Sequence, residues 1–467
     1  MVANHAESYN ELLARHRADV RDTMFSAVRR LRWSADQLAA ERERRLREIL
    51  AWSVARSPFH ATRLAGVDAA NFTEADLPSL PIMTKADLMG RFDEVVCDRA
   101  LTLEVVNAHL EHLHHDDYLR GQYRVFMTSG TTGDTARFVH GWDDWATFVA
   151  MAGRWRGRDG SRLPLDAPIG SLFASSAKHI SGALHAFTRG MADDEAPLVH
   201  LPPSMAIAEI VAALNAAQPV VLQGYPSSVG LLAREAVAGR LRISPKRVLT
   251  CGEQCTDATR AAVAEVWGIG VDDYWGCSEG AYAFPCEAGD GMHLPDDLVI
   301  VEPVDRDGNA VAPGVPAAKI LLTNLYNRTQ PLIRYEITDA MTLMAGTCPC
   351  GCAHRRITDL AGRSETLFFY DGDAVVHSIG IEGLFLSAPA VVGLQVTQTR
   401  RGADVAVIID RDCNLESLRC GLIDLMARSG VADPQVTIRA VDALERLWSG
   451  KVQKFQPLPH ATPPEGR

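Results

Sequence analysis

A short run of hydroxyl and glycine residues has the composition of a loop that binds phosphate. Its members are Thr128, Ser129, Gly130, Thr131, Thr132 and Gly133. Ser and Thr hydroxyls donate to phosphate oxygens, and glycines permit the positive φ values that turn successive backbone N–H groups toward one anion. A Walker A loop would end in Gly-Lys-Ser/Thr, whereas Asp134 follows here, so another group must supply the positive charge. Taken alone, such a run is also typical of a solvated turn.

Further motifs follow this loop along the chain. They are Tyr-Trp-Gly-Cys-Ser-Glu at 274–279, Arg-Tyr-Glu-Ile-Thr-Asp at 334–339, Gly-Arg-Ser-Glu at 362–365 and Ser-Gly-Lys at 449–451. In this order they resemble the core motifs of adenylate-forming enzymes, the superfamily of acyl-CoA synthetases, luciferases and non-ribosomal adenylation domains. Segments 57–60, 224–228, 251–253 and 348–351 resemble the phenylacetate-CoA ligase branch in particular. The resemblance spans nearly the whole chain.

The resemblance implies an ATP-dependent ligase. Such an enzyme activates a carboxylic acid, here aryl or arylacetic, as acyl-AMP with release of pyrophosphate, and then transfers the acyl group to CoA. Because this chemistry brings two anions together, the site must hold and neutralise the triphosphate and keep the acid aligned. An alternative keeps the adenylation step but uses an amine or a carrier-protein thiol as acceptor. A binding or scaffold protein that kept only the fold is a third hypothesis.

The resemblance also implies a role for each charged residue of the motifs. Lys451 is the expected catalytic lysine, which bridges the carboxylate and the α-phosphate as charge develops. Glu279 helps to hold Mg²⁺ on the phosphates, and Asp339 accepts both ribose hydroxyls. Arg363 reaches the ribose or a phosphate, and Glu365 occupies the hinge about which the small domain rotates. Taken singly, these residues would be ordinary solvated or paired charges.

Other residues are expected to contact the adenine or the acid. The adenine side comprises Gly252, Glu253, Tyr274 and Trp275, and the acid side comprises His179, Tyr225 and Gly276. Aromatic faces in these segments suit the stacking of adenine or of an aromatic acid. His179 is equally typical of an ordinary histidine at the start of a helix, and the two aromatics of residues 274–275 are equally typical of core residues.

A structural zinc site is predicted on four residues of two loops. Cys348 and Cys350 lie in a Cys-Pro-Cys-Gly knuckle, in which two thiolates can point at one ion, and Cys286 with His293 would complete a closed tetrahedral site. Some members of the branch carry such a site. The alternative is that these are ordinary thiols; Cys352 is a substitute ligand and His354 a weaker one. A second group, His109, His112, His114, His115, Asp116 and Asp117, has no spacing that fits a tetrahedral site and is interpreted as a solvated loop.

The chain departs from the family pattern in two places. Many members have a lysine three residues after the last glycine of the loop, where this chain has Ala136, with Arg137 the nearest base. Where the branch usually continues after Glu365 through an Arg-Gly pair into a turn that shapes the thiol tunnel, this chain has a different sequence at 366–374. The second departure bears on the acceptor, and leaves CoA and an amine both open.

The sequence predicts that the elements that position these residues form an α/β fold. Apolar spacing predicts helices over residues 9–55, and strands near 168–173, 219–222 and 247–250 alternate with helical stretches such as 207–217. Residues 298–303 and 318–323, joined by a turn at 305–308, predict a small antiparallel β subdomain. Strand 405–409 and helix 415–427 predict a small α+β C-terminal domain, which the resemblance implies is mobile. We therefore expect a large domain of layered α/β sheets at 1–364, which binds ATP and acid, and a small domain at 365–467, which carries Lys451.

Composition limits the possible partners. The chain has 467 residues, a net charge of −11 and a pI near 5.8, so two or more domains are expected. An acidic protein offers no counter-charge to nucleic acid or an anionic membrane, so we expect neither as a partner. No run has the length of a membrane span and the N-terminus lacks the pattern of a signal peptide, which predicts a cytoplasmic location. The expected partners are ATP, a small carboxylic acid, CoA or an amine, and a second copy in a homodimer.

Overall fold

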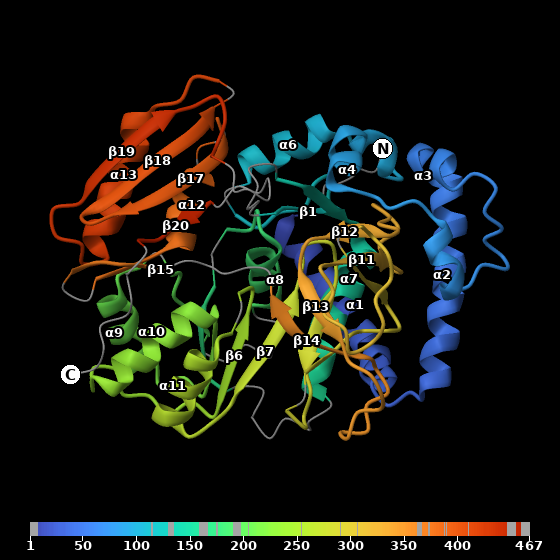
Figure 1. Cartoon of the computed structure of the whole chain (residues 1–467), viewed down its shortest axis with the longest axis horizontal. Coiled ribbons are helices and arrows are strands. Elements are labelled where there is room, and N and C mark those ends of the chain that lie inside the picture. Colours follow the sequence, from blue (N-terminus) through green and yellow to red (C-terminus); the bar gives the residue numbers. More distant parts are fainter. Residues whose placement is uncertain are drawn as a thin grey trace, which may run out of the picture.

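The fold was analysed in a computed structural model of the chain (Figure 1). The structure describes residues 8–113, 115–128, 135–157, 167–173, 176–189, 198–203, 205–253, 255–289, 291–305, 307–361, 367–371, 374–386, 388, 390–409, 411–445 and 454–458.

Two long helices begin the described chain, as the sequence predicted. Helix α1 (Tyr9–Arg30) and helix α2 (Ala35–Arg56) each start at a serine whose side chain takes part in a capping box. Ser8 pairs with Glu11, and Ser34 with Gln37, so backbone N–H groups in the first turn of each helix have an acceptor. Helix α1 packs along α7 (Trp142–Gly153), while α2 lies on the outer flank of the molecule (Figure 1).

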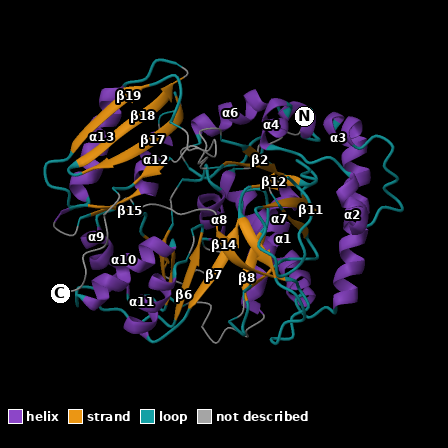
Figure 2. Cartoon of the chain, in the orientation of Figure 1, coloured by secondary structure: helices purple, strands orange, loops and turns teal. Residues whose placement is uncertain are grey.

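Shorter helices connect the strands of the large region. They are α3 (Pro58–Arg63), η1 (Glu74–Ser79), α4 (Lys85–Gly90), α5 (Phe92–Val95), α6 (Leu103–His112), η2 (Arg154–Gly157), α8 (Ile180–Thr188), α9 (Ile207–Ala217), α10 (Pro226–Val237) and α11 (Asp257–Trp267). Figure 2 shows α9, α10 and α11 together beside the central sheet. None of the helices described here has the length and apolar character required to cross a membrane.

A nine-stranded sheet forms the centre of the large region. Its strands, in spatial order, are β13 (Ala340–Leu343), β14 (Arg356–Ala361), β9 (Met292–His293), β8 (Tyr282–Pro285), β7 (Val271–Gly276), β6 (Arg247–Cys251), β5 (Val221–Gly224), β3 (Ile169–Leu172) and β4 (Leu198–His200). Strands β4, β3, β5, β6 and β7 are parallel, and from β7 onward the neighbours are antiparallel. The predicted strands near 169, 221 and 247 and the helix at 207–217 are thus confirmed.

Both faces of the parallel strands are buried. Leu222 and Val248 point into a cluster with α9, α10 and α11, whereas their neighbours Val221 and Leu249 point into a cluster on the other face. Side chains alternate between the two faces of a strand, so a strand that is covered on both sides needs an unbroken apolar run. This explains why the sequence shows such runs here.

Two smaller sheets complete the large region. Strands β10 (Val299–Val304), β11 (Lys319–Asn324) and β12 (Tyr335–Ile337) form the antiparallel subdomain that the sequence predicted. The turn after β10 is held by Asp305, whose side chain accepts the backbone N–H groups of Asp307 and Asn309, both at 2.9 Å. Strands β1 (Arg124–Met127) and β2 (Arg137–His140) form a hairpin around the predicted phosphate loop.

The C-terminal region, residues 367–458, has a sheet and a hydrophobic cluster of its own. Its elements are β15 (Leu367–Phe369), β16 (Val375–His377), α12 (Ser378–Leu386), β17 (Val391–Thr399), β18 (Gly402–Ile409), α13 (Leu415–Arg428), β19 (Gln435–Ala440) and β20 (Phe455–Gln456). The strand order of its four-stranded sheet is β19-β18-β17-β20. The α/β fold class is confirmed. The domain boundary predicted after Ser364 lies outside the described residues and stays a prediction.

One buried histidine lies among aromatic rings beside the hairpin. His140 is fully buried, and neither ring nitrogen has a hydrogen-bond partner in the described part of the chain. The rings of Phe126, Trp145, Phe148 and Tyr326 surround it, with centroids between 5.4 and 6.1 Å away. Burial lowers the pKa of His140 to about 3, because the charged imidazole would lose its hydration.

We expect His140→Phe to flatten the acid dependence of stability. The unfolded chain takes up this proton near the ordinary histidine pKa, whereas the folded chain does so only near pH 3. The contribution of His140 to the free energy of unfolding is therefore fully present above about pH 6.5 and decreases as the pH falls toward 3. Between pH 7 and pH 5 the variant should lose about 2 kcal/mol less free energy of unfolding than the wild type, measured by urea titration. Phe126→Leu, which changes the same cluster without removing a titratable group, should keep the wild-type slope.

Candidate active site

The carboxyl ends of the parallel strands gather several predicted site residues at one edge of the sheet. Tyr225 follows β5, Gly252 and Glu253 follow β6, and Trp275 and Gly276 end β7. Because neighbouring parallel strands release the chain at the same edge, residues from distant motifs meet there. This is the position at which open α/β sheets bind their ligands.

The predicted phosphate loop is closed at its base. The backbone N–H of Thr128 donates to the carbonyl of Ala136 at 3.1 Å, and the Thr128 hydroxyl accepts the Ala136 N–H at 2.9 Å. Residues 129–134, which include Ser129, Gly130, Thr131, Thr132 and Gly133, lie outside the described residues, so their phosphate role stays a prediction. The described residues on either side of the loop, Thr128 and Ala136, extend the pairing of β1 with β2.

Arg137 is held at the end of this loop. Its Nε donates to the side chain of Asn107 at 2.8 Å, and its Nη1 donates to the carbonyl of Thr135 at 2.7 Å. The guanidinium is therefore fixed close to the loop, beside the position where other members have the lysine that Ala136 replaces. An arginine in this place can offer a positive charge to the loop without being part of it.

Two of the predicted motifs meet directly. The indole Nε1 of Trp275 donates to the Oδ2 of Asp339 at 2.9 Å, and both side chains are buried. The bond joins the end of β7 to the turn between β12 and β13, across 64 residues of sequence. A hydrogen bond to a carboxylate in a buried place is directional and fixes the orientation of the acid. Asp339 is thus positioned by Trp275, which belongs to the motif at residues 274–279.

Tyr274 and Trp275 point to opposite faces of β7. Tyr274 packs against Trp155 and Tyr282, with ring centroids 4.8 and 5.6 Å away, in the cluster that contains Leu249. Trp275 belongs to the main hydrophobic cluster instead. Adjacent residues of a strand alternate in direction, so the two rings cannot stack on the same side of one ligand. Their predicted contacts with adenine or acid stay predictions, with Trp275 the one that is bonded to Asp339.

Glu279 lies in a tight turn between β7 and β8. Its backbone carbonyl accepts the Asn324 side-chain amide at 3.1 Å, and the next carbonyl, that of Gly280, accepts the Tyr326 hydroxyl at 2.7 Å. Gly280 has φ of +94°, and a Cβ there would meet the Asn324 Nδ2 at 2.5 Å. The glycine is therefore required for the turn that places Glu279, whose side chain is buried. Its Mg²⁺ role stays a prediction.

Gly252 allows the chain to pass close to an aromatic ring. Its φ is +89°, and a Cβ would lie 3.1 Å from the ring of Tyr225. Gly276 is packed in a similar way, since a Cβ there would lie 3.0 Å from the ring of Tyr282. The glycines of these motifs thus keep the backbone near the aromatic side chains that the sequence placed at the site.

The C-terminal region contributes a residue that the sequence did not predict. Glu253 accepts the backbone N–H of Ser227 at 2.9 Å and its hydroxyl at 2.8 Å. The same hydroxyl lies 2.6 Å from the Nε2 of His377, at the end of β16. No spacing rule connects residues 150 positions apart, so His377 carried no signal in the sequence beyond its place at the end of an apolar strand.

His179 caps the start of α8 beside the loop hairpin. Its Nδ1 lies 3.1 Å from the carbonyl of Met127. Burial lowers the pKa of His179, while Glu382 of the C-terminal region raises it and Lys454 lowers it. The predicted acid-side histidine therefore lies within electrostatic reach of charges on the C-terminal region.

Lys451 and Arg363 lie outside the described residues, but both ends of the segment with Lys451 are fixed. The Gln395 side chain donates to the backbone carbonyl of Glu445 and accepts its backbone N–H, both at 3.1 Å. The Val396 N–H donates to the Lys454 carbonyl at 2.7 Å. Gln395 and Val396 are neighbours in β17. The two residues that flank segment 446–453 are therefore held at one point of this sheet.

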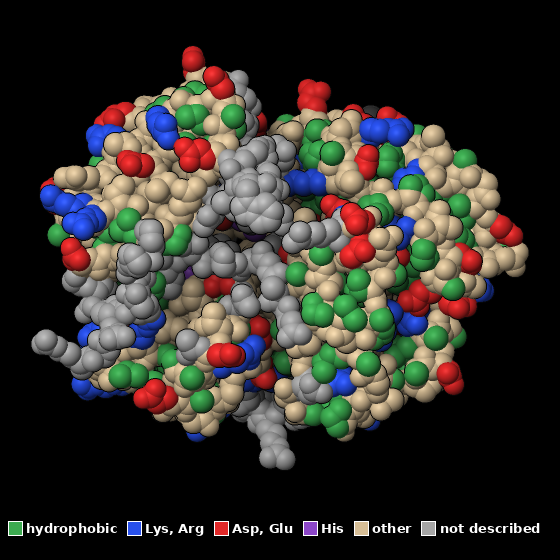
Figure 3. Space-filling model, viewed as in Figure 1, with side chains coloured by type: hydrophobic (Ala, Val, Ile, Leu, Met, Phe, Trp, Pro, Cys, Tyr) green, Lys and Arg blue, Asp and Glu red, His purple; other side chains and the backbone are tan. Residues whose placement is uncertain are grey.

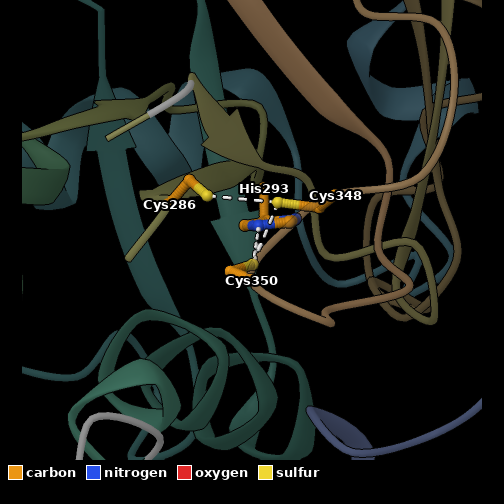
Figure 4. A group of neighbouring side chains, drawn as sticks. All are labelled: Cys286, His293, Cys348 and Cys350. Atoms are coloured by element: carbon orange, nitrogen blue, oxygen red, sulfur yellow. Dashed lines mark hydrogen bonds between the residues drawn. The ribbon is translucent and has the colours of Figure 1, made fainter. Parts of the chain in front are cut away.

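The four predicted zinc ligands converge in space (Figure 4). The ligand atoms of Cys286, His293, Cys348 and Cys350 all lie within 4.8 Å of one another, the one such group found in the described residues. The sulfur atoms of Cys348 and Cys350 are 3.0 Å apart, and Cys286 lies 3.2 Å from Cys348. These separations are too long for disulfides. Burial, together with the hydrogen bond to Cys350, raises the pKa of Cys348 to about 12, so ionised thiols here require a cation.

His293 presents the nitrogen that a metal would need. Its Nδ1 lies 2.8 Å from the His354 carbonyl, which can only accept, so Nδ1 carries the proton. The Nε2 lone pair then points toward the Sγ of Cys350 at 3.3 Å. Such a bond from the second nitrogen to a backbone carbonyl is usual for a metal-bound imidazole. The donor set fits zinc.

The alternative ligands lie outside this group. Cys352 is buried but is not among the converging atoms, and His354 accepts the backbone N–H of Asp296 at 3.1 Å. In the histidine-rich segment, Asp116 is bonded to Tyr9 at 2.6 Å and to Arg124. His114 is outside the described residues. The described part of that segment makes ordinary structural contacts.

The sequence is similar to known phenylacetate-coenzyme A ligases. The one from Thermus thermophilus is 26% identical over 382 residues, with 79% of this chain and 79% of the relative covered. The one from Escherichia coli is 27% identical over 367 residues, with 74% and 75% covered. A comparison with models of protein families finds no match.

The fold is similar to solved structures of a 2-hydroxyisobutyryl-CoA ligase. One, in the postadenylation state in complex with 2-HIB-AMP, has a TM-score of 0.57 and 18% identity, with 92% of each chain covered. Another, in complex with 2-HIB-AMP and CoA, has a TM-score of 0.56. The fold is thus that of the adenylate-forming enzymes. The sequence relatives are phenylacetate-CoA ligases, at 26% and 27% identity, which agrees with the branch that the motifs resemble.

We expect Trp275→Phe to weaken ATP binding. Loss of the indole N–H leaves a buried Asp339 oxygen without its donor, and a hydrogen bond to a charged group is worth enough to change affinity about tenfold or more. Calorimetric titration with ATP measures the effect. Trp267→Phe is the matched control, because the Trp267 Nε1, on α11, has no hydrogen-bond partner among the described residues. Equal affinities of the two variants would contradict the role of the Trp275–Asp339 bond.

Proposed function

We propose that this protein is an adenylate-forming acid–CoA ligase, which activates a carboxylic acid with ATP as acyl-AMP and pyrophosphate and then transfers the acyl group to CoA. An aryl or arylacetic acid is the proposed substrate class. Tyr225 and Phe173, whose rings meet edge to face at 5.1 Å, support this class, because aromatic side chains at the sheet edge suit a flat acid.

One observation carries the proposal. The motifs of adenylate-forming enzymes occur in order in a chain whose similarity to phenylacetate-CoA ligases covers 79% of its length. The meeting of Trp275 with Asp339 at the ligand-binding edge of the sheet supports it, because the bond brings two of these motifs together.

Each residue of the site has its own role in the proposed first step. Asp339, oriented by Trp275, holds the ribose, and Thr128 with the loop it closes holds the β- and γ-phosphates. Glu279 would bind Mg²⁺, which neutralises phosphate charge when present. Lys451 places its ammonium between the carboxylate and the α-phosphate, where negative charge grows as the acid attacks and pyrophosphate leaves. Gly252 and Glu253 line the adenine, and Arg363 reaches the ribose or a phosphate.

The second step requires Lys451 to leave and a nucleophile to enter. We propose that the C-terminal region turns about Glu365 between the steps, as the resemblance implies. Because the segment with Lys451 is attached to β17 at both ends, the lysine moves with this region. The domain division at residue 364 is part of this proposal.

An amine or a carrier-protein thiol is the second candidate for the acceptor. The observation that favours it is the sequence at 366–374, which differs from the turn that shapes the thiol tunnel in the branch. Product analysis with CoA and with amines, starting from the same acyl-AMP, decides between them.

Zinc at Cys286, His293, Cys348 and Cys350 is proposed as a structural ion. Cys286 follows β8, His293 ends β9, and Cys348 and Cys350 lie between β13 and β14, so the ion would tie these segments together at the antiparallel end of the sheet. A homodimer and a cytoplasmic location remain predictions from the sequence. On the face shown in Figure 3, acidic and basic side chains are interspersed.

We expect Lys451→Ala to abolish most of the adenylation rate. Loss of a cation that acts on transition-state charge should lower acid-dependent pyrophosphate exchange by about 10²- to 10³-fold. The assay uses labelled pyrophosphate across a panel of aryl and aliphatic acids. Lys246→Ala, at an exposed lysine before β6, should exchange like the wild type. Unchanged exchange in Lys451→Ala, or no exchange with any acid in the wild type, would contradict the mechanism.

The metal proposal predicts one zinc ion per chain. The double variant Cys348→Ser/Cys350→Ser should lose the zinc found by elemental analysis and unfold at a lower temperature, because a structural ion contributes its binding energy to folding. Cys420→Ser, which removes an exposed thiol on α13, is the matched control and should keep the metal. Native protein without zinc would show that the cluster holds only thiols.

A further inference from the structure

The C-terminal region contacts the large region through a few described side chains. Arg411 forms an ion pair with Glu111 at 2.9 Å, in which both side chains are largely exposed. The guanidinium of Arg234 lies over the ring of Phe369 at 5.5 Å. The third contact is the one between His377 and Ser227, which differs from the others because Ser227 in turn bonds Glu253, a predicted adenine-side residue.

The donors and acceptors of this third contact form a chain. The Ser227 hydroxyl has one proton, and the Glu253 carboxylate, 2.8 Å away, can only accept it. The Nε2 of His377 must therefore carry a proton and donate to the Ser227 oxygen at 2.6 Å. The same Nε2 lies 3.4 Å from the Glu253 Oε1. We call His377, Ser227 and Glu253 the clasp.

The clasp is shielded from water. The side chains of His377 and Glu253 have exposed fractions of 5% and 3%, whereas those of Arg411 and Glu111 have 52% and 39%. Hydrogen bonds to a buried carboxylate are stronger than an exposed ion pair, which solvent and salt weaken. The clasp is therefore the polar contact that should favour this arrangement of the two regions most.

The arrangement that the clasp holds also brings the end of the lysine segment toward the site. Lys454 is paired with Glu382 at 2.5 Å, and both charges act on His179, the acid-side histidine. Lys451 precedes Lys454 by three residues, which span about 11 Å at most. The C-terminal region thus faces the site with the clasp and with the Lys454–Glu382 pair.

We propose that His377 is a positioning residue: through Ser227 and Glu253 it holds the C-terminal region in the orientation used for adenylation, so that this orientation depends on the residue beside the adenine. The inference rests on the proposed function. Opening the clasp would release the region for the second step. Because the clasp ends on the adenine-side residue Glu253, the effect of His377 should fall on adenylation and spare the transfer to CoA.

The test measures the two half-reactions separately. In His377→Ala, acid-dependent pyrophosphate exchange should fall about tenfold, while thioester formation from supplied acyl-AMP and CoA should change less than about threefold. Ser227→Ala, which removes the bridging hydroxyl from the other side, should give the same split. His377→Gln, whose amide N–H can replace the Nε2 donor, should restore exchange to within about threefold. Equal losses in both half-reactions, or none, would overturn the proposal.

A second measurement does not depend on activity. Hydrogen exchange followed by mass spectrometry should show faster exchange in peptides covering 225–253 and 374–386 of His377→Ala than of the wild type. Arg411→Ala, which breaks the exposed contact, is the matched control and should leave these peptides and both half-reactions unchanged. Unchanged exchange in His377→Ala would refute the clasp. If the wild type adenylates no acid, the proposed function fails, while hydrogen exchange still decides whether the clasp holds the two regions together.

Discussion

The parallel alignment of β3, β5, β6 and β7 is the constraint on which the rest of the site depends. Parallel neighbours end at one edge, so the segments after β5, β6 and β7 meet there although they are far apart in sequence. The sheet turns antiparallel after β7, and this reversal allows the chain to return and place Asp339 against Trp275. The apolar strands and the polar loops are therefore two parts of one arrangement: the strands fix the edge, and the loops supply the chemistry.

Much of this arrangement could be predicted from the sequence. Strands covered on both faces need unbroken apolar runs, and those runs marked β3, β5 and β6. The antiparallel subdomain was marked by a turn whose Asp305 holds the backbone. The four residues predicted to bind zinc lie close together, because a Cys-x-Cys knuckle has few geometries and restricts where its partners can lie. In each case a local chemical requirement limits the structure.

The other features of the site could not be predicted, because they depend on contacts between distant residues that have no local sequence signal. Side-chain direction along β7 separates Tyr274 from Trp275, and a motif read as a string of letters does not say which of two adjacent rings faces the ligand. The bonds from Trp275 to Asp339 and from His377 to Ser227 join distant segments through single side chains, so no periodicity marks them. For the same reason, the position of Glu279 could not be predicted from the sequence, because it depends on the turn at Gly280 and on the packing of Gly280 against Asn324.

The bonds that hold Glu445 at Gln395 and Lys454 at Val396 affect the rate at which a distant lysine could act. A residue on a free linker samples a volume that grows with linker length, and its effective concentration at any one point is diluted accordingly. Here Glu445 and Lys454, which flank the segment that contains Lys451, are bonded to adjacent residues of one strand, so both flanking residues are held at β17. Under the proposed function, a rigid-body turn of the C-terminal region would therefore act on the chemistry by changing the effective concentration of the lysine ammonium at the α-phosphate.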